Sequence, residues 1–293
     1  TYTIRIYGSY DSIRFENAGD KDKIVSLDQW GTQTWTTMYR AFDGCSNIEI
    51  PATDTPDFSA AVNMSMTSMF DGAALANPDT SGWDTSSVKF MSYMFYGATS
   101  ANPDTSGWDT SSVVDLNYMY FDATAANTDT SGWDTSLVTG MRYMFYQATA
   151  ANPDTSGWDM SRVTDTSYMF RGVTLSRPNY EALLINWSAQ ALRSGLNFDG
   201  GNSTYCSQAA ANARADMINS DGWTITDRGQ DCAGQTLPPA VVTSAASSVS
   251  ASGARLNGTA DPNGASTSAW FQWGTSTAYG NATAPQTNVG SGT

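Results

Sequence analysis

The sequence predicts an α/β repeat solenoid of 25-residue coils, each a short strand plus a short helix, with caps at both ends and a partial all-β sandwich after it. Two observations lead to this prediction. The octapeptide that starts at Asn77 returns at Asn102, Asn127 and Asn152, each time 25 residues further on, with Thr128 in place of proline in the third copy. Apolar residues in the second half of each copy keep the same phase, and a fixed period of this length is typical of stacked-coil folds.

Each copy divides into an extended half and a helical half. Residues 76–81 are poor in helix formers, so we expect a strand whose Ala76, Pro78 and Thr80 point inward. From Val88 the apolar residues fall at i, i+3, i+6 and i+7, one face of a short helix, and Asp84 suits its N-cap. Stacking the coils would bury a column of tryptophans, namely Trp83, Trp108, Trp133 and Trp158.

The repeat region needs caps, because a solenoid must cover its last apolar faces. We expect an N-terminal cap over 1–57, the repeat solenoid over 58–174 and a C-terminal cap over 175–235. A second helix is expected over 207–219 and a closing strand over 223–225. Short apolar runs and turn residues predict a partial β-sandwich over 240–293. A first covering helix is predicted by the apolar stripe of Tyr180, Leu183, Leu184, Trp187 and Ala191.

The repeat motif is Asn-x-Asp-x-Ser-x-Trp-Asp-Thr-Ser-x-Val-x-x-Met-x-x-Met-Phe. It resembles the repeat of the BspA-like leucine-rich-repeat bacterial surface proteins, and residues 30–47 and 175–188 are similar to the caps of that family. The C-terminal segment resembles a fibronectin type III-like module. The resemblance implies leucine-rich-repeat-like coils, an extracellular or cell-surface location, and adhesion or partner binding without enzymatic activity.

Composition excludes several functions. The 293 residues include 14 Lys+Arg, 28 Asp+Glu and no His, for a formal charge of −14. Nucleic-acid binding is not expected, because it depends on Lys and Arg that neutralise phosphates. Without histidine there is no Ser-His or Cys-His nucleophile. We also expect no membrane insertion of this chain and no signal peptide, because no apolar run approaches ~18 residues and the start lacks a basic segment.

Three cysteines are too few for a disulfide scaffold. Cys206 and Cys232 could form one disulfide, which would indicate an oxidising compartment. Cys45 would then remain as a small buried apolar residue.

Stacked coils would place equivalent outward residues in ladders. Neighbouring carboxylates would repel, and two interpretations of what compensates stay open. Either each Asp accepts backbone N–H groups in an Asx turn, or the row binds Ca²⁺ or a polar ligand such as a glycan. No other cofactor is expected. A second row, Asp84, Asp109, Asp134 and Asp159, is expected to cap the helices. The candidate ligand ladder comprises Asn77, Asp79, Ser81, Asn102, Asp104, Ser106, Asn127, Asp129, Ser131, Asn152, Asp154 and Ser156.

A second candidate site is an exposed aromatic row for protein or sugar contact. Its members lie one position off the core stripe: Tyr93, Tyr118, Tyr143 and Tyr168. The threonine column at Thr80, Thr105, Thr130 and Thr155 shares its parity with inward residues, so ice binding is not expected. An enzyme is not expected either, because near-identical aspartates lack the unequal environments that separate an acid from a base.

The residues and the resemblance together predict an extracellular bacterial surface protein whose solenoid is a non-catalytic adhesion or partner-binding module. The partner would be a host or matrix protein or a surface glycan, with self-association as a further possibility. The alternative is a structural subunit of an extracellular filament, assembled by strand complementation of the incomplete C-terminal sandwich.

Overall fold

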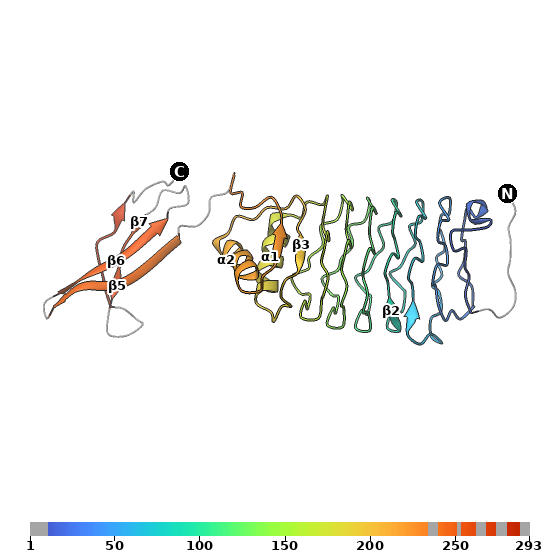
Figure 1. Ribbon diagram of the computed structural model, residues 1–293, viewed down its shortest axis with the longest axis horizontal. Helices are drawn as coiled ribbons and strands as arrows, with labels where there is room; N and C mark the ends of the chain where they lie inside the picture. Colours follow the sequence, from blue (N-terminus) through green and yellow to red (C-terminus); the bar gives the residue numbers. More distant parts are fainter. Residues whose placement is uncertain (1–10, 234–239, 251–252, 262–267, 274–279, 288–293) are drawn as a thin grey trace. The chain divides into compact units, whose positions relative to one another are not determined.

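The computed structural model describes residues 11–233, 240–250, 253–261, 268–273 and 280–287. The chain divides into two compact units, Thr1–Asp231 and Cys232–Thr293. In the first unit the chain winds into coils that lie side by side, and helices α1 and α2 follow them at the C-terminal end of the unit (Figure 1). Residues 1–10 and 234–235 of the predicted caps, and parts of the predicted sandwich, lie outside the described residues.

The coils are built from turns, and the predicted α/β solenoid of alternating strand and helix is wrong. Residues 58–174, all of which the structure describes, contain no helix and only two strands, β1 (Met64–Ser65) and β2 (Val88–Phe90). These two strands pair in parallel. Single parallel bridges then continue from Phe90 to Asp115, Gly140 and Asp165, one in each coil. We call residues 58–174 the coil stack.

The helices fail to form because the backbone amides alternate between two partners. The N–H groups of Met91, Tyr93 and Phe95 donate to carbonyls of the next coil at 3.1, 3.0 and 2.9 Å. The N–H of Met94, between them, donates to Met91 within its own coil at 3.2 Å. Tyr93 also has a φ of 58°, which an α-helix of L-residues excludes. The apolar spacing that suggests a helix is therefore the spacing of consecutive turns.

The extended half of each coil has the predicted facing but forms no strand in residues 76–81. Ala76, Pro78 and Thr80 are buried, and Asn77 and Asp79 are exposed. This alternation arises because the chain is extended there. Neighbouring coils are joined at this segment by side-chain hydrogen bonds and not by a ladder of backbone hydrogen bonds.

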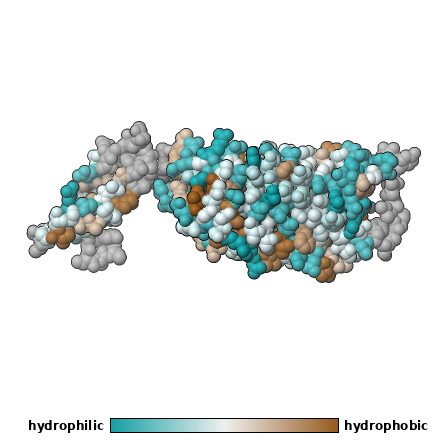
Figure 2. Space-filling view, viewed as in Figure 1, coloured by the Kyte–Doolittle hydropathy of each residue, from teal (hydrophilic) through white to brown (hydrophobic). Residues whose placement is uncertain are grey.

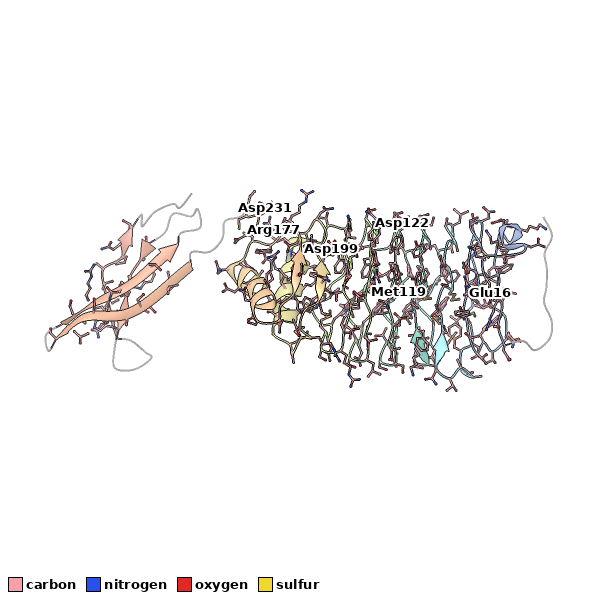
Figure 3. The ribbon with its side chains drawn as sticks, viewed as in Figure 1. Glu16, Met119, Asp122, Arg177, Asp199 and Asp231 are labelled. Carbon is pink, nitrogen blue, oxygen red and sulfur yellow. The ribbon has the colours of Figure 1, made fainter. Side chains whose placement is uncertain are left out.

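Aromatic columns fill the core. The rings of Phe70, Phe95, Tyr120, Phe145 and Phe170 stack in order, with neighbouring centroids 5.3–5.6 Å apart. Trp108, Trp133 and Trp158 stack in a second column at 6.2 and 6.0 Å. Each of these three indole N–H groups donates to a threonine carbonyl of the preceding coil. In Figure 3, Met119 lies within the stack and Asp122 at its rim. The columns therefore make one continuous core across the coils.

The end regions cover this core. A short 3-10 helix, η1 (Lys21–Lys23), lies in the N-terminal part. After the coils come α1 (Arg177–Ser188), β3 (Asn197–Asp199), α2 (Gln208–Asn219) and β4 (Thr224–Thr226), with β3 and β4 paired in parallel. Helix α1 buries Tyr180, Leu183, Leu184 and Trp187. Ala191, the last residue of the predicted stripe, is exposed, because the helix ends before it.

The C-terminal unit contains antiparallel strand pairs. Strand β5 (Ala240–Ser250) pairs with β6 (Gly253–Asp261), β7 (Ser268–Ala269) with β10 (Gln286–Thr287), and β8 (Gln272–Trp273) with β9 (Asn281–Ala282). Within the described part of this unit these pairs form three separate two-stranded sheets. The predicted resemblance to a fibronectin type III module finds no support in them.

Candidate functional site

The asparagines of the candidate ladder connect the coils. The side-chain oxygen of Asn77 accepts the backbone N–H of Asn102 at 2.8 Å. Asn102 and Asn127 repeat this contact at 2.8 and 3.0 Å. Asn152 ends the series by accepting the N–H of Ser176 at 2.7 Å. These side chains replace a backbone ladder along residues that form no strand, so their role is structural.

The aspartates of the same ladder form Asx turns. One carboxylate oxygen of Asp79 accepts both the N–H and the hydroxyl of Ser81, at 3.1 and 2.7 Å. Asp104 and Asp129 repeat both contacts with the serine two residues on. In each case the serine hydroxyl and N–H lower the pKa of the carboxyl below its ordinary value. The carboxylates are therefore held by their own turns.

The prediction that the second aspartate row, which starts at Asp84, caps helices is wrong, because residues 58–174 contain no helix. Asp84 instead accepts the N–H and hydroxyl of Ser86 at 3.1 and 2.6 Å, in a second Asx turn. Asp109, Asp134 and Asp159 each accept the N–H of the serine two residues on. The serine hydroxyl and N–H lower the pKa of the Asp84 and Asp134 carboxyls below the ordinary value.

A metal centre has little basis in this arrangement. No group of three or more Asp, Glu, Cys or His side chains in the described part of the chain could hold an ion. The threonine column is equally closed to a ligand, since Thr80, Thr105, Thr130 and Thr155 are completely buried.

The predicted tyrosine row is brought together as a stack. Tyr93, Tyr118, Tyr143 and Tyr168 stack in order with centroids 4.5, 4.9 and 4.7 Å apart. All four have φ between 54° and 59°. The first three side chains are half-buried, and Tyr168 is 38% exposed.

A second row adjoins the first and was missed in the sequence. Tyr96, Phe121 and Tyr146 stack with centroids 4.5 Å apart in both steps. The two rows touch, with Tyr93 and Tyr96 5.7 Å apart and Tyr143 and Tyr146 5.3 Å apart. An aromatic residue at the same 25-residue interval was the signal that could have found this row. We call these seven residues the aromatic face.

Charged groups border the aromatic face. The guanidinium of Arg142 lies 5.0 Å from the ring centroid of Tyr143, and that of Arg171 lies 5.3 Å from Tyr168. Burial raises the pKa of the Tyr93 and Tyr96 phenols above the ordinary value. These tyrosines therefore stay neutral at physiological pH. The face of the coils visible in Figure 2 is mostly teal and white, with several brown hydrophobic patches.

Two further clusters lie outside the predicted sites. Near the first coils, the Nε of Arg40 donates to the buried Asp43 at 2.7 Å. The negative charge of Asp43 also contributes to a raised pKa of the Asp71 carboxyl. In the C-terminal cap, Arg214 makes two hydrogen bonds to Asp227, at 2.8 and 3.1 Å. These contacts join α2 to the residues after β4 and hold the cap closed.

Cys206 and Cys232 are disulfide-bonded, and Cys45 is free and buried. Because the chain has three cysteines, the two bonded residues pair with each other. The bond closes a loop that contains α2 and β4. No described helix is long and apolar enough to cross a bilayer.

The first unit is thus a repeat protein of turn-built coils, and it carries two aromatic ladders on its surface. The family described as "Mycoplasma protein of unknown function, DUF285" matches residues 12–108 and 64–182. These matches span more than half of the chain, and the chain belongs to this family. No curated protein and no solved structure matches this chain.

The family match corrects the resemblance inferred from the repeat motif. The chain belongs to the DUF285 family, and its assignment to the BspA-like leucine-rich-repeat family is wrong. The leucine-rich-repeat fold, secretion and adhesion were inferred from that resemblance, and neither the family match nor the turn-built coils support them.

Proposed function

We propose that this chain is a non-catalytic binding module that docks a protein partner on its aromatic face. One observation supports this proposal most directly: seven partly exposed rings are stacked in two adjoining ladders. Each ring is already fixed by its neighbours, so little side-chain entropy is lost on binding. Rigid tyrosine-rich surfaces of this kind are typical of protein interfaces.

The stacking favours a protein over a glycan chain along this face. Within each ladder the ring faces cover one another, so the interior rings offer mainly their edges to a ligand. Edges and phenol hydroxyls suit the backbone and side chains of a protein, whereas a sugar stacks on a ring face. The formal charge of −14 favours a partner with a basic surface, through long-range attraction.

The disulfide supports a location outside the cytosol. Disulfides persist in oxidising compartments and are rare where glutathione keeps thiols reduced. The Cys206–Cys232 bond therefore agrees with an extracellular or cell-surface protein.

Binding to an array of extracellular-matrix proteins and glycans tests the proposal. We expect a protein on the array to be bound, and the triple variant Tyr96→Ser, Phe121→Ser, Tyr146→Ser to bind it about 30-fold or more weakly, as expected for central aromatic contacts. The matched control is Leu75→Ser, Phe90→Ser, Leu137→Ser, which removes partly exposed apolar side chains outside the two ladders. Equal binding by both triple variants would contradict the proposal.

Self-assembly through the C-terminal unit is the alternative. Among its described residues this unit exposes Val241, Val242, Val249, Trp270 and Trp273, which is more apolar surface than a small unit usually leaves uncovered. Sedimentation over a range of concentrations separates the two functions. Growth into long polymers would favour the filament, and a constant monomer would exclude it.

A further inference from the structure

The tyrosine row ends at Tyr168, and one face of this last ring is not covered by another ring. Tyr143 stacks on Tyr168 at 4.7 Å. On the other side the next segment of chain is β3, where Thr166 bridges to Phe198. No described aromatic ring stacks on Tyr168 from that side; the Arg171 guanidinium lies 5.3 Å from its ring centroid, and the residue is 38% exposed.

A hollow lies at this end of the row. Its volume is about 270 Å³, and Ser167, Tyr168, Asn197, Phe198, Asp199, Thr224 and Thr226 line it. Figure 3 places Asp199 on β3, next to the last coils. The hollow is slightly smaller than the roughly 300–1,000 Å³ of drug-sized pockets, so it suits a ligand of one ring.

Most of the residues that β3 and β4 contribute to the lining are polar. Asn197 pairs with Thr224 and Asp199 with Thr226 in the parallel register of β3 and β4. The side chains of Asn197, Thr224 and Thr226 are exposed, while the intervening Phe198 is buried. Asp199 accepts the N–H of Gly201 through one carboxylate oxygen at 2.9 Å. An amide, two hydroxyls and a carboxylate therefore line the hollow together with the partly exposed Tyr168 ring, beside the Arg171 guanidinium.

We propose that this hollow binds a neutral pyranose ring. A pyranose has a face of C–H groups, which are attracted to the negative face of an aromatic ring. Its hydroxyls both donate and accept, and so match the amide, hydroxyl and carboxylate groups of the wall. Phosphorylated ligands are disfavoured by the acidic chain. The inference rests on the proposed binding function and adds a second class of ligand, at the end of the same face.

Saturation-transfer NMR with the methyl glycosides of glucose, galactose, mannose and N-acetylglucosamine tests this. At least one should receive saturation, mainly at the C–H groups of one ring face. Tyr168→Phe keeps the ring and should retain binding. Tyr168→Asn tolerates the φ of 59° but removes the ring, and should bind about tenfold more weakly.

The matched control is Tyr93→Asn, at the other end of the row, where φ is also positive at 58°. It loses one ring of the same stack but does not line the hollow, so it should bind the glycoside like the wild type. Binding by none of the four glycosides, or equal binding by Tyr168→Asn and Tyr93→Asn, would overturn the inference. The triple variant Tyr96→Ser, Phe121→Ser, Tyr146→Ser should lose protein binding and still bind the glycoside. That result would distinguish this site from the proposed protein interface.

Discussion

At the scale of single residues, the tyrosines of the aromatic face combine strain with stacking. Tyr93, Tyr118, Tyr143 and Tyr168 all adopt positive φ, which costs an L-residue about 1–2 kcal/mol. Each ring stack contributes about 0.5–1.5 kcal/mol beyond its buried area. The N–H of Tyr93 also reaches the next coil. Stacking and the inter-coil hydrogen bond therefore offset the strain, and the row holds the coils together as well as forming a surface.

Asp71 is a second residue whose environment has a measurable consequence. Burial and the charge of Asp43 raise the pKa of its carboxyl to about 6, and the Ser68 hydroxyl only partly opposes them. The unfolded chain has an ordinary Asp pKa near ~3.9. Between these values the folded state binds a proton that the unfolded state does not. Asp71 therefore contributes stability that is present below ~pH 3.9 and is lost as the pH rises through about 6.

The first prediction concerns Asp71→Asn, which stays neutral and keeps an oxygen to accept the Ser68 hydroxyl. We expect this variant to melt at a higher temperature than the wild type at pH 7.5. Near pH 4, where Asp71 is mostly protonated in the folded state, the difference should shrink. Thermal melts of both proteins at several pH values measure it. A difference that stays constant from pH 4 to pH 7.5 would contradict the raised pKa.

At the scale of elements, the coil is held by side chains where a strand was predicted. Along residues 76–81 the Asn side chains reach across the coils, and the Asp side chains stabilise the bends within each coil. In each inter-coil contact, a single asparagine side-chain oxygen accepts the hydrogen bond that a backbone carbonyl would accept in a regular strand. The extended half therefore depends on its residue types more than a regular strand would.

A second prediction follows for Asn127, in the middle of the series. Asn127→Ala removes the oxygen that accepts the Asn152 N–H and should lower the free energy of unfolding by about 1 kcal/mol. Asn127→Asp keeps an acceptor and should lie closer to the wild type. Urea unfolding of the three proteins measures the difference. Equal stability of wild type and Asn127→Ala would show that water replaces this contact at no cost.

At the scale of the whole molecule, each coil is completed by its neighbours. Half of the amides in residues 91–98 donate to the next coil, and one aromatic column runs from Phe70 to Phe170. A single coil would expose both faces of its rings and leave these amides unpaired. Stability therefore rests on the stack as a unit, and the end caps matter because they cover the last core faces.

The third prediction addresses the C-terminal cap. The Cys206–Cys232 disulfide closes the loop that carries α2 and β4, and a loop of this length corresponds to about 3 kcal/mol. Reduction with dithiothreitol should therefore lower the melting temperature. Cys45→Ala should remain as sensitive to the reductant as the wild type, while the double variant Cys206→Ala, Cys232→Ala should melt low with or without it. A melting temperature that reductant leaves unchanged would show that the cap does not depend on the bond.

Much of the candidate site was predictable because equivalent residues of stacked copies must lie above one another. The 25-residue interval placed the tyrosine row, and simple alternation gave the inward facing of Ala76 and Thr80. The hollow beside Tyr168 was not predictable, because its wall comes from β3 and β4, which have no counterpart in the repeat. The second aromatic row has the same 25-residue spacing as the first, so the sequence contains the signal for it as well.

The period, the inward and outward residues of the extended half, and the helices of the C-terminal cap could all be predicted from the amino-acid sequence. These depend on patterns within one segment of chain, such as the apolar spacing of α1. That the second half of each coil is a series of turns depends on contacts between coils. The amides there are shared between neighbouring coils, and Tyr93 can adopt positive φ because Tyr118 stacks on it. The spacing of apolar residues within one coil does not show that a backbone N–H has its acceptor in the next coil. The helix prediction was wrong for this reason.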